Sequence, residues 1–182
     1  MGRFMNHKKW VVALALIATA LILTHLPVSE ADAAASASDF QIEGSTLTKY
    51  RGSDERVTIP DTVEVVGESA FENNQKVQLV VVPKSVKCMD AYVFWGCDNL
   101  EEVVLGKGLT SVDEYAFSGC TGLKQITIPE NVQSIDAQAF AGCTNLTDIY
   151  IPDTVTSIAD DAFLNCDNVT IHADEGLSLI HI

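Results

Sequence analysis

The chain repeats itself every 23 residues, and this periodicity limits its possible folds more than any other feature. A hydrophobic residue followed in four of five copies by proline recurs at that interval, at Ile59-Pro60, Val82-Pro83, Leu105-Gly106, Ile128-Pro129 and Ile151-Pro152. An aromatic residue keeps the same spacing, as Phe71, Phe94, Phe117, Phe140 and Phe163. Five copies without insertion or deletion indicate stacked structural units, so residues 56–171 are predicted to form a solenoid.

Each copy contains two hydrophobic stretches with different spacing. Two hydrophobic residues two positions apart, such as Ile126 and Ile128, precede the proline, and this alternation predicts a short strand with both side chains in the core. Equivalent strands on successive turns would lie about 4.8 Å apart and form one parallel sheet. Hydrophobic residues three positions apart, such as Val132 and Ile135, follow the proline. They predict short turns or 3-10 segments opposite the sheet.

Residues 34–55 do not fit the repeat. Two alternating stretches, 40–42 and 46–50, are separated by Glu43-Gly44-Ser45, and this arrangement predicts a hairpin. The terminal units of a solenoid are usually atypical, because they must shield the open end of the core. The segment 34–55 is therefore predicted to be a linker and an N-terminal cap.

The N-terminus has the pattern of an export signal. Residues 1–9 are basic, residues 10–26 are almost wholly apolar, and small residues follow. This order predicts a secretory signal peptide over residues 1–33, with cleavage after Ala33, Ala35 or Ala37. The apolar run reaches the lower limit of a membrane span, so an uncleaved signal anchor is the alternative. The only predicted membrane contact is through this segment.

The repeat from Leu123 to Leu146 reads L-K-Q-I-T-I-P at its start and A-F-A-G-C-T-N-L at its end, and it resembles the BspA-type leucine-rich repeat. The segment Leu47–Gly52 is similar to the stretch that often precedes the first such repeat. The resemblance implies a leucine-rich-repeat solenoid that is secreted or displayed on a cell surface, mostly in bacteria. It also implies a binding or adhesion module that is often part of a longer protein. Departures such as Asn74 for Cys, Val93 for Ala and Gly106 for Pro are interpreted as tolerated variants.

Composition excludes two function classes. A net charge of -14 argues against a nucleic-acid partner, because phosphate binding requires a basic surface. Beyond the leader the chain has two histidines, His172 and His181, and no nucleophile–base motif. An enzyme is therefore not expected, and no cofactor or metal is predicted.

Two columns of reactive residue types recur with the repeat. Four cysteines share one position and are predicted to be buried free thiols rather than disulfides, because stacked equivalents fill one corner of the core: Cys97, Cys120, Cys143 and Cys166. Cys88 is interpreted as another small packing residue. Three aspartates share a second position, at Asp90, Asp113 and Asp136. They are interpreted as caps that accept backbone N–H bonds, with a calcium site as the alternative.

The candidate partner-binding residues are those that point outward from the predicted sheet. Leu79, Val81 and Val104 would form a small apolar patch beside Glu102, Gln125 and Tyr150. Exposed apolar patches rimmed by polar groups often mark interfaces. Equally, valine on an exposed strand can reflect β propensity alone. Trp95 is a second candidate, expected on a turn near Tyr92.

The tail, residues 172–182, is interpreted as truncated, because the last six residues, Leu177–Ile182, resemble the translation of a sequencing-library end. A short cap strand is the alternative. The sequence thus predicts a non-catalytic extracellular recognition or adhesion module that binds proteins or cell surfaces. The alternative is an accessory or spacer array in a larger secreted enzyme or wall-anchored protein.

Overall fold

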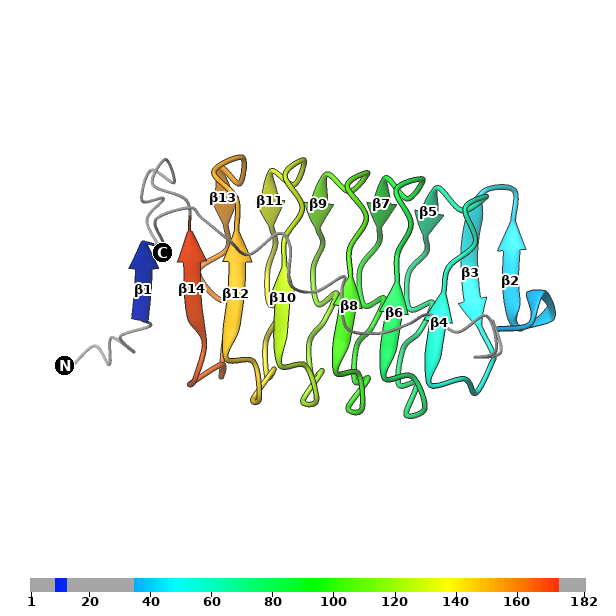
Figure 1. Cartoon of the computed structure of the whole chain (residues 1–182), viewed down its shortest axis with the longest axis horizontal. Coiled ribbons are helices and arrows are strands. Elements are labelled where there is room, and N and C mark those ends of the chain that lie inside the picture. The colour runs from blue at the N-terminus through cyan, green and yellow to red at the C-terminus, as the bar shows by residue number, and fades with distance from the viewer. Residues whose placement is uncertain (1–8, 13–34, 174–182) are drawn as a thin grey trace, which may run out of the picture.

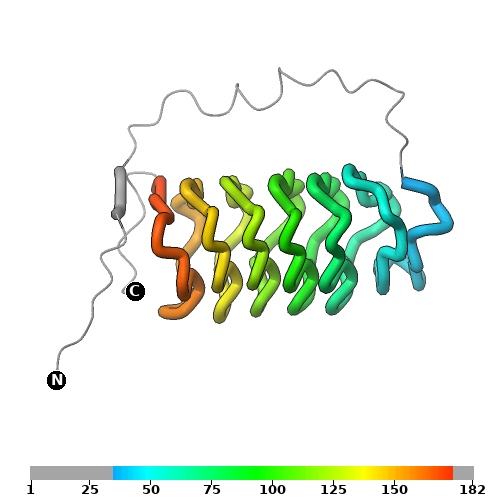
Figure 2. The backbone as a smooth tube through the Cα atoms, turned by 90° about the horizontal axis from the view of Figure 1, so that it is seen from below, coloured from blue at the N-terminus to red at the C-terminus, as the bar shows by residue number. Residues whose placement is uncertain are grey.

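The computed structural model describes residues 9–12 and 35–173. Residues 40–173 form a single β-solenoid, in which each turn of the solenoid stacks on the next. Figure 1 shows the strands side by side along the long axis, with the cap at one end and β14, flanked by β1, at the other. Figure 2 shows the same backbone as a regular coil. The described helical structure is one short 3-10 helix, η1 (Ala37–Asp39), and none of it has the length or apolar character that a membrane crossing requires.

The first strand column contains the strands that were predicted. The five predicted strands are β4 (Arg56–Thr58), β6 (Leu79–Val81), β8 (Glu102–Val104), β10 (Gln125–Thr127) and β12 (Asp148–Ile151). A sixth strand, β14 (Thr170–Ala173), was not predicted. Paired strands run parallel and in the register of the repeat, as in Val80↔Val103 and Ile126↔Ile149. The central residue of each strand is buried and its neighbours are more exposed, which confirms the predicted alternation.

A second strand column occupies the region where the sequence predicted only turns or 3-10 segments. It consists of β5 (Val65–Val66), β7 (Cys88–Met89), β9 (Ser111–Val112), β11 (Ser134–Ile135) and β13 (Ser157–Ile158), with β3 (Thr46–Tyr50) at its start. The prediction of one sheet therefore needs correction in this detail. Because the turns stack in register, even two extended residues find the same two residues on the next turn and pair with them.

The predicted hairpin cap is confirmed. Strand β2 (Phe40–Glu43) pairs antiparallel with β3, and Gly44 takes a left-handed φ of 63° in the turn between them. Strand β3 then pairs in parallel with β5, so the cap leads directly into the second column. The stack therefore begins before Arg56, and at the other end β14 continues the first column beyond the fifth repeat.

One short strand lies in the predicted leader. Strand β1 (Lys9–Val12) pairs in parallel with β14, in the register Lys9↔Thr170. The rest of the predicted signal peptide and residues 174–182 of the predicted truncated tail lie outside the described residues. Cleavage of the leader and the nature of the tail both stay predictions.

The core is an aromatic ladder that runs through the stack and into the cap. The five repeat phenylalanines stack with neighbouring ring centroids 5.0–5.4 Å apart. Tyr50 of β3 continues the ladder at 5.0 Å from Phe71, and Phe40 follows at 5.1 Å from Tyr50. All of these rings are buried, so the cap covers the end of the core with the same ring type that the repeats use.

The column of four cysteines lies beside this ladder, and its thiols are free and buried, as predicted. Each thiol donates to the carbonyl oxygen of the aromatic residue on the preceding turn, as from Cys97 to Phe71 and from Cys120 to Phe94, both at 3.1 Å. In the first repeat the position holds Asn74. Its side-chain oxygen accepts from the backbone N–H groups of Lys76 and Val77, at 2.9 and 3.1 Å, and so closes its own turn locally.

The third turn interrupts both strand columns. In the described residues, strand pairing stops between β8 and β10 in the first column and between β7 and β9 in the second. Two glycines replace larger residues between β8 and β9. A Cβ atom on Gly106 would lie 2.7 Å from the Val82 carbonyl oxygen, and one on Gly108 would contact the carbonyl oxygens of Lys84 and Val86. The third turn thus approaches the second too closely for side chains at these positions.

Candidate functional site

The structure brings four of the predicted residues together on the first strand column. Leu79 pairs with Glu102 and Val81 pairs with Val104, across strands β6 and β8. Val104 is 37% exposed, while Leu79, Val81 and Glu102 are half-buried. The predicted apolar patch with an acidic neighbour therefore exists on the surface of the stack. We call these four residues the strand-face patch.

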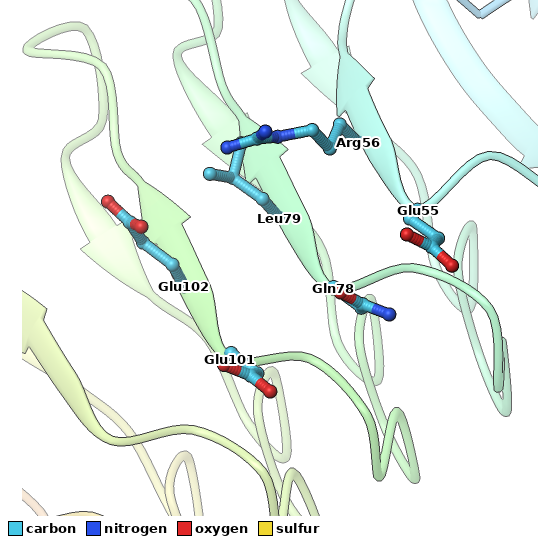
Figure 3. A pocket seen from close by; sticks show the side chains of 6 residues that line it. All are labelled: Glu55, Arg56, Gln78, Leu79, Glu101 and Glu102. Carbon is cyan, nitrogen blue, oxygen red and sulfur yellow. The ribbon is translucent and has the colours of Figure 1, made fainter. Parts of the chain in front are cut away.

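A shallow, open pocket of about 240 Å³ adjoins the strand-face patch, and Figure 3 shows the side chains around it. It is lined by Glu55, Arg56, Gln78, Leu79, Glu101 and Glu102. The Arg56 side chain extends toward Leu79 of the neighbouring strand (Figure 3). The Nζ atom of Lys124 lies 2.6 Å from a carboxylate oxygen of Glu101 in an exposed ion pair. Three of the six lining residues are thus acidic, one is basic and one is apolar, so the pocket has a net negative charge.

The predicted binding residues did not include Arg56 of this pocket. They also missed three residues at equivalent repeat positions, Glu55, Gln78 and Glu101. These three stand 23 residues apart, immediately before the strands β4, β6 and β8. The periodicity therefore contained the signal that they form a column. The sequence did not show that this column borders a hollow, because that depends on how the chain bends into each strand.

Tyr150 belongs to a separate cluster near β14. Its ring stacks on the imidazole of His172 with centroids 4.5 Å apart, and the Nε2 atom of His172 lies 2.8 Å from an oxygen of Asp148. Hydrogen bonds from His172 and then Thr147 lower the pKa of the Asp148 carboxyl below its ordinary value. Gln125 is exposed on β10, between this cluster and the strand-face patch.

Trp95 lies away from the first strand column, on the turn that follows β7. The residue is 40% exposed, and its indole ring meets the ring of Tyr92 edge-on, with centroids 6.5 Å apart. Tyr92 stacks in turn on Tyr115 of the next turn, at 4.8 Å and 5°. The predicted position of Trp95 on a turn near Tyr92 is confirmed, but Trp95 is not continuous with the strand-face patch.

The aspartate column forms different bonds from those predicted. Asp113 accepts a hydrogen bond from the Ser111 hydroxyl at 2.6 Å, and Asp90 accepts one from the Cys88 thiol at 3.3 Å. The partners are thus side chains two residues earlier. Burial, and then repulsion from Asp136 and Asp90, raise the pKa of Asp113, although the Ser111 bond opposes that shift.

One group in the described residues has ligand atoms close enough to hold a metal ion: Cys88, Asp90 and Asp113, within 4.8 Å of one another. An ion there would have to displace the hydrogen bonds just described. The thiol is also protonated at neutral pH, because burial and then the bond to Asp90 raise the pKa of Cys88 to about 12. The Cys88–Asp90 hydrogen bond is thus equivalent to the Ser111–Asp113 hydrogen bond of the next turn, with a thiol in place of the hydroxyl.

Comparison with known proteins identifies the repeat. Residues 45–170 match the family described as the BspA type leucine rich repeat region, in six copies. No curated protein matches the chain. The match begins at residue 45, within the hairpin, so it includes part of the cap that precedes the five repeats.

Solved structures with the same fold come from bacteria. A leucine rich cell surface protein of Faecalibacterium prausnitzii A2-165 is 34% identical with a TM-score of 0.69, over 70% of this chain and 35% of that protein. The leucine rich repeat protein of T. pallidum is 28% identical with a TM-score of 0.72, over 75% and 69%. A leucine-rich repeat protein of Bacteroides ovatus ATCC 8483 is 27% identical with a TM-score of 0.62, over 73% and 40%.

These proteins are named for their repeats or their location, and not for a catalytic activity. The chain spans about a third of the length of the F. prausnitzii protein. The match over residues 45–170 covers more than half of the sequence, and the stacked fold agrees with it. The chain therefore belongs to the BspA-type leucine-rich repeat family.

Proposed function

We propose that the chain is a non-catalytic recognition module, secreted or held at a bacterial cell surface, that binds a protein through the strand-face patch. The observation that carries the proposal is the patch itself: an exposed Val104 with Leu79 and Val81 beside it, next to an acidic pocket. Apolar side chains at the centre and charged ones at the rim are typical of protein interfaces.

The shape of the surface also favours a protein over a small molecule. The pocket is open and of about 240 Å³, below the usual range for sites that enclose a drug-sized ligand. A protein partner would instead lie across several turns and could reach Gln125 and Tyr150 farther along the column. Solenoids commonly offer such extended surfaces. The cell-surface name of the F. prausnitzii relative supports the proposed location.

The test is adhesion of the purified protein to a panel of extracellular-matrix proteins and intact cells. Val81→Glu places a charge in the centre of the patch and should reduce binding about tenfold or more, since a buried unpaired charge in an interface costs several kcal/mol. Tyr150→Ala should reduce binding if the partner reaches the far cluster. Equal binding of all variants would contradict the proposal.

The matched control is Val81→Thr, because threonine occupies the same position in two other repeats, as Thr58 and Thr127. It should fold normally and bind within about twofold of the wild type. The alternative function, a spacer array in a larger protein, predicts no specific binding by the repeats. It would be supported if no surface in the panel retained the wild-type protein.

A further inference from the structure

A second surface lies on the turns that follow β7 and β9, apart from the strand-face patch. Here Tyr92, Trp95 and Tyr115 form a cluster in which Trp95 contacts the edge of Tyr92 and the two tyrosine rings stack. Trp95 is 40% exposed, and both tyrosines are half-buried. We call these three residues the aromatic turn cluster. Ring-to-ring contacts restrain all three side chains, so little rotamer entropy remains to be lost on binding.

The backbone makes tyrosine a costly choice at these positions. Tyr92 and Tyr115 have φ angles of 60° and 56°, and the same left-handed conformation occurs at Ser69 and Gln138 of neighbouring turns. Left-handed φ is unfavourable for bulky residues, and glycine or asparagine would adopt it more readily. Residues held in an unfavourable backbone conformation often have a functional role.

The surroundings of the cluster are acidic. The turn segments 67–73, 90–96 and 113–119 contain no lysine or arginine and five carboxylates, namely Glu68, Glu72, Asp90, Asp113 and Glu114. Glu72 occupies the position of Trp95 one turn earlier, and the register is fixed by a 2.7 Å bond from the Asn73 N–H to the Trp95 carbonyl. Lys49 lies near the first of these segments, and its Nζ donates to the Ser69 carbonyl at 2.8 Å.

These five carboxylates make the electrostatic field around the cluster negative. Repulsion from Asp136 and Asp90 contributes to the raised pKa of Asp113, after burial. A negative field selects a cationic partner and repels anionic lipid and nucleic acid. A second copy of the chain is also disfavoured, because each copy carries a net charge of -14.

We propose that the aromatic turn cluster is a docking site for a lysine- or arginine-rich segment of another protein. Guanidinium and ammonium groups are attracted to tryptophan and tyrosine faces, and each such contact contributes about 0.5–2 kcal/mol. The flanking carboxylates would pair with neighbouring basic side chains of the segment. The site is independent of the strand-face patch, so either surface could fail its test without affecting the other.

The chain offers a direct optical probe of this site. It has two tryptophans, Trp10 in the predicted leader and Trp95. In a Trp10→Phe background, Trp95 is the one indole, and its fluorescence reports on the cluster. Titration with a twelve-residue arginine–glycine peptide should give a saturable change in Trp95 emission. The lysine–glycine peptide should bind more weakly, and a glutamate–glycine peptide should produce no change. Failure of the arginine peptide to alter the emission would overturn the proposal.

Substitutions taken from other repeats allow the site to be removed without loss of the fold. Trp95→Ser copies Ser118, and Tyr92→Gln copies Gln138, each at the equivalent position of another turn. Calorimetric titration should show about tenfold weaker peptide binding for Trp95→Ser, the loss of one strong cation–π contact. The matched control is Leu164→Ser, which changes an exposed residue at the same repeat position on the fifth turn. It should bind within about twofold of the wild type.

A second pair of variants separates a specific site from general attraction between a basic peptide and an acidic protein. Glu114→Gln and Asp153→Asn each remove one negative charge, the first beside the cluster and the second on the fifth turn, outside both proposed surfaces. The proposal expects a larger loss of binding for Glu114→Gln. Equal losses for the two variants, or wild-type affinity in Trp95→Ser, would show that net charge alone attracts the peptide, and would overturn it.

Discussion

Asp113 shows how stacking places like charges next to one another. Its position recurs with the repeat, so Asp90 lies one turn before it and Asp136 one turn after it. Burial and the two neighbouring carboxylates raise its pKa above the ordinary 3.8. A carboxyl group with a raised pKa in the folded state favours folding below its unfolded pKa. That contribution is lost as the pH rises through the folded value.

We therefore predict that Asp113→Asn stabilises the protein at pH 7. The asparagine oxygen can still accept from Ser111, and the charge repulsion disappears. The gain should be a few tenths of a kcal/mol and at most about 1, because the carboxyl is only half-buried and solvent still screens its charge. Urea unfolding midpoints at pH 7 and at about pH 3 provide the measurement. The advantage should vanish at the lower pH, where the wild-type carboxyl is protonated. A lower midpoint at pH 7 would contradict the prediction.

Burial makes the cysteine thiols unreactive. Burial raises the pKa of the Cys97 thiol to about 12, and those of Cys120 and Cys143 well above their ordinary value; for Cys143 the hydrogen bond with Cys166 is the largest cause. The thiolate is the reactive form, so these residues are structural.

We predict that the native protein reacts slowly with a thiol reagent such as Ellman's at pH 8, and that all five cysteines react at once in denaturant. Cys88, the half-buried one, should be the first to react in the native state, although its pKa of about 12 keeps it slow. Mass spectrometry of the labelled protein identifies the sites. Fast labelling of one native thiol would show a reactive centre instead.

At the scale of the element, Gly106 corrects an expectation from the sequence. Glycine in place of the repeat proline was interpreted as a tolerated variant, but no Cβ fits there without a shift, since the Val82 and Pro83 carbonyls are too close. The one-dimensional pattern showed that the residue differs. It could not show the distance to the preceding turn, which sets whether a side chain fits.

Restoring the repeat residue should consequently harm the protein. We predict that Gly106→Pro destabilises it by about 1–3 kcal/mol, as overpacking of a tight contact does. Proline in a compatible loop would instead stabilise by about 0.4–1 kcal/mol. Thermal or urea unfolding distinguishes the two signs. Pro129→Gly, at the same position in the next repeat, is the control and should cost less than Gly106→Pro.

Other elements were predictable because the parallel register equals the repeat length. Val81 and Val104 occupy the same position in successive repeats and also pair in space, and so do Leu79 and Glu102. The two-residue strands of the second column were not predicted, because two residues are too few for alternation to be detected. The position of Trp95 relative to the patch was equally hidden, since it depends on how each turn bends between its two strands.

At the scale of the whole molecule, the aromatic ladder runs without a break along the stack, whereas strand pairing is interrupted. Rings stack from Phe40 in the cap to Phe163 in the fifth repeat, while both columns of strands are interrupted around the third turn. Core packing therefore links all turns. Backbone hydrogen bonds between the aromatic segments also cross the interruption, as from the Phe94 N–H to the Ala116 carbonyl and from the Phe117 N–H to the Ala139 carbonyl, both at 2.8 Å. Strand pairing alone is divided into two groups. In a solenoid, stability is approximately a sum over turns and the interfaces between them, so a weaker interface matters for the whole array.

The interruption at the third turn has a consequence for how the folded chain opens. Amide protons held by pairing between turns exchange with solvent through local or partial unfolding, in cooperative units bounded by weak interfaces. We predict two such units, one ending with β8 and one beginning with β9, with the fastest core exchange between them, near Gly106 and Gly108. Deuterium uptake measured by mass spectrometry would test this, and a single uniform protection level along residues 40–173 would argue against it. If the two units exist, the stack is stiff within each unit and deforms most easily at the boundary between β8 and β9.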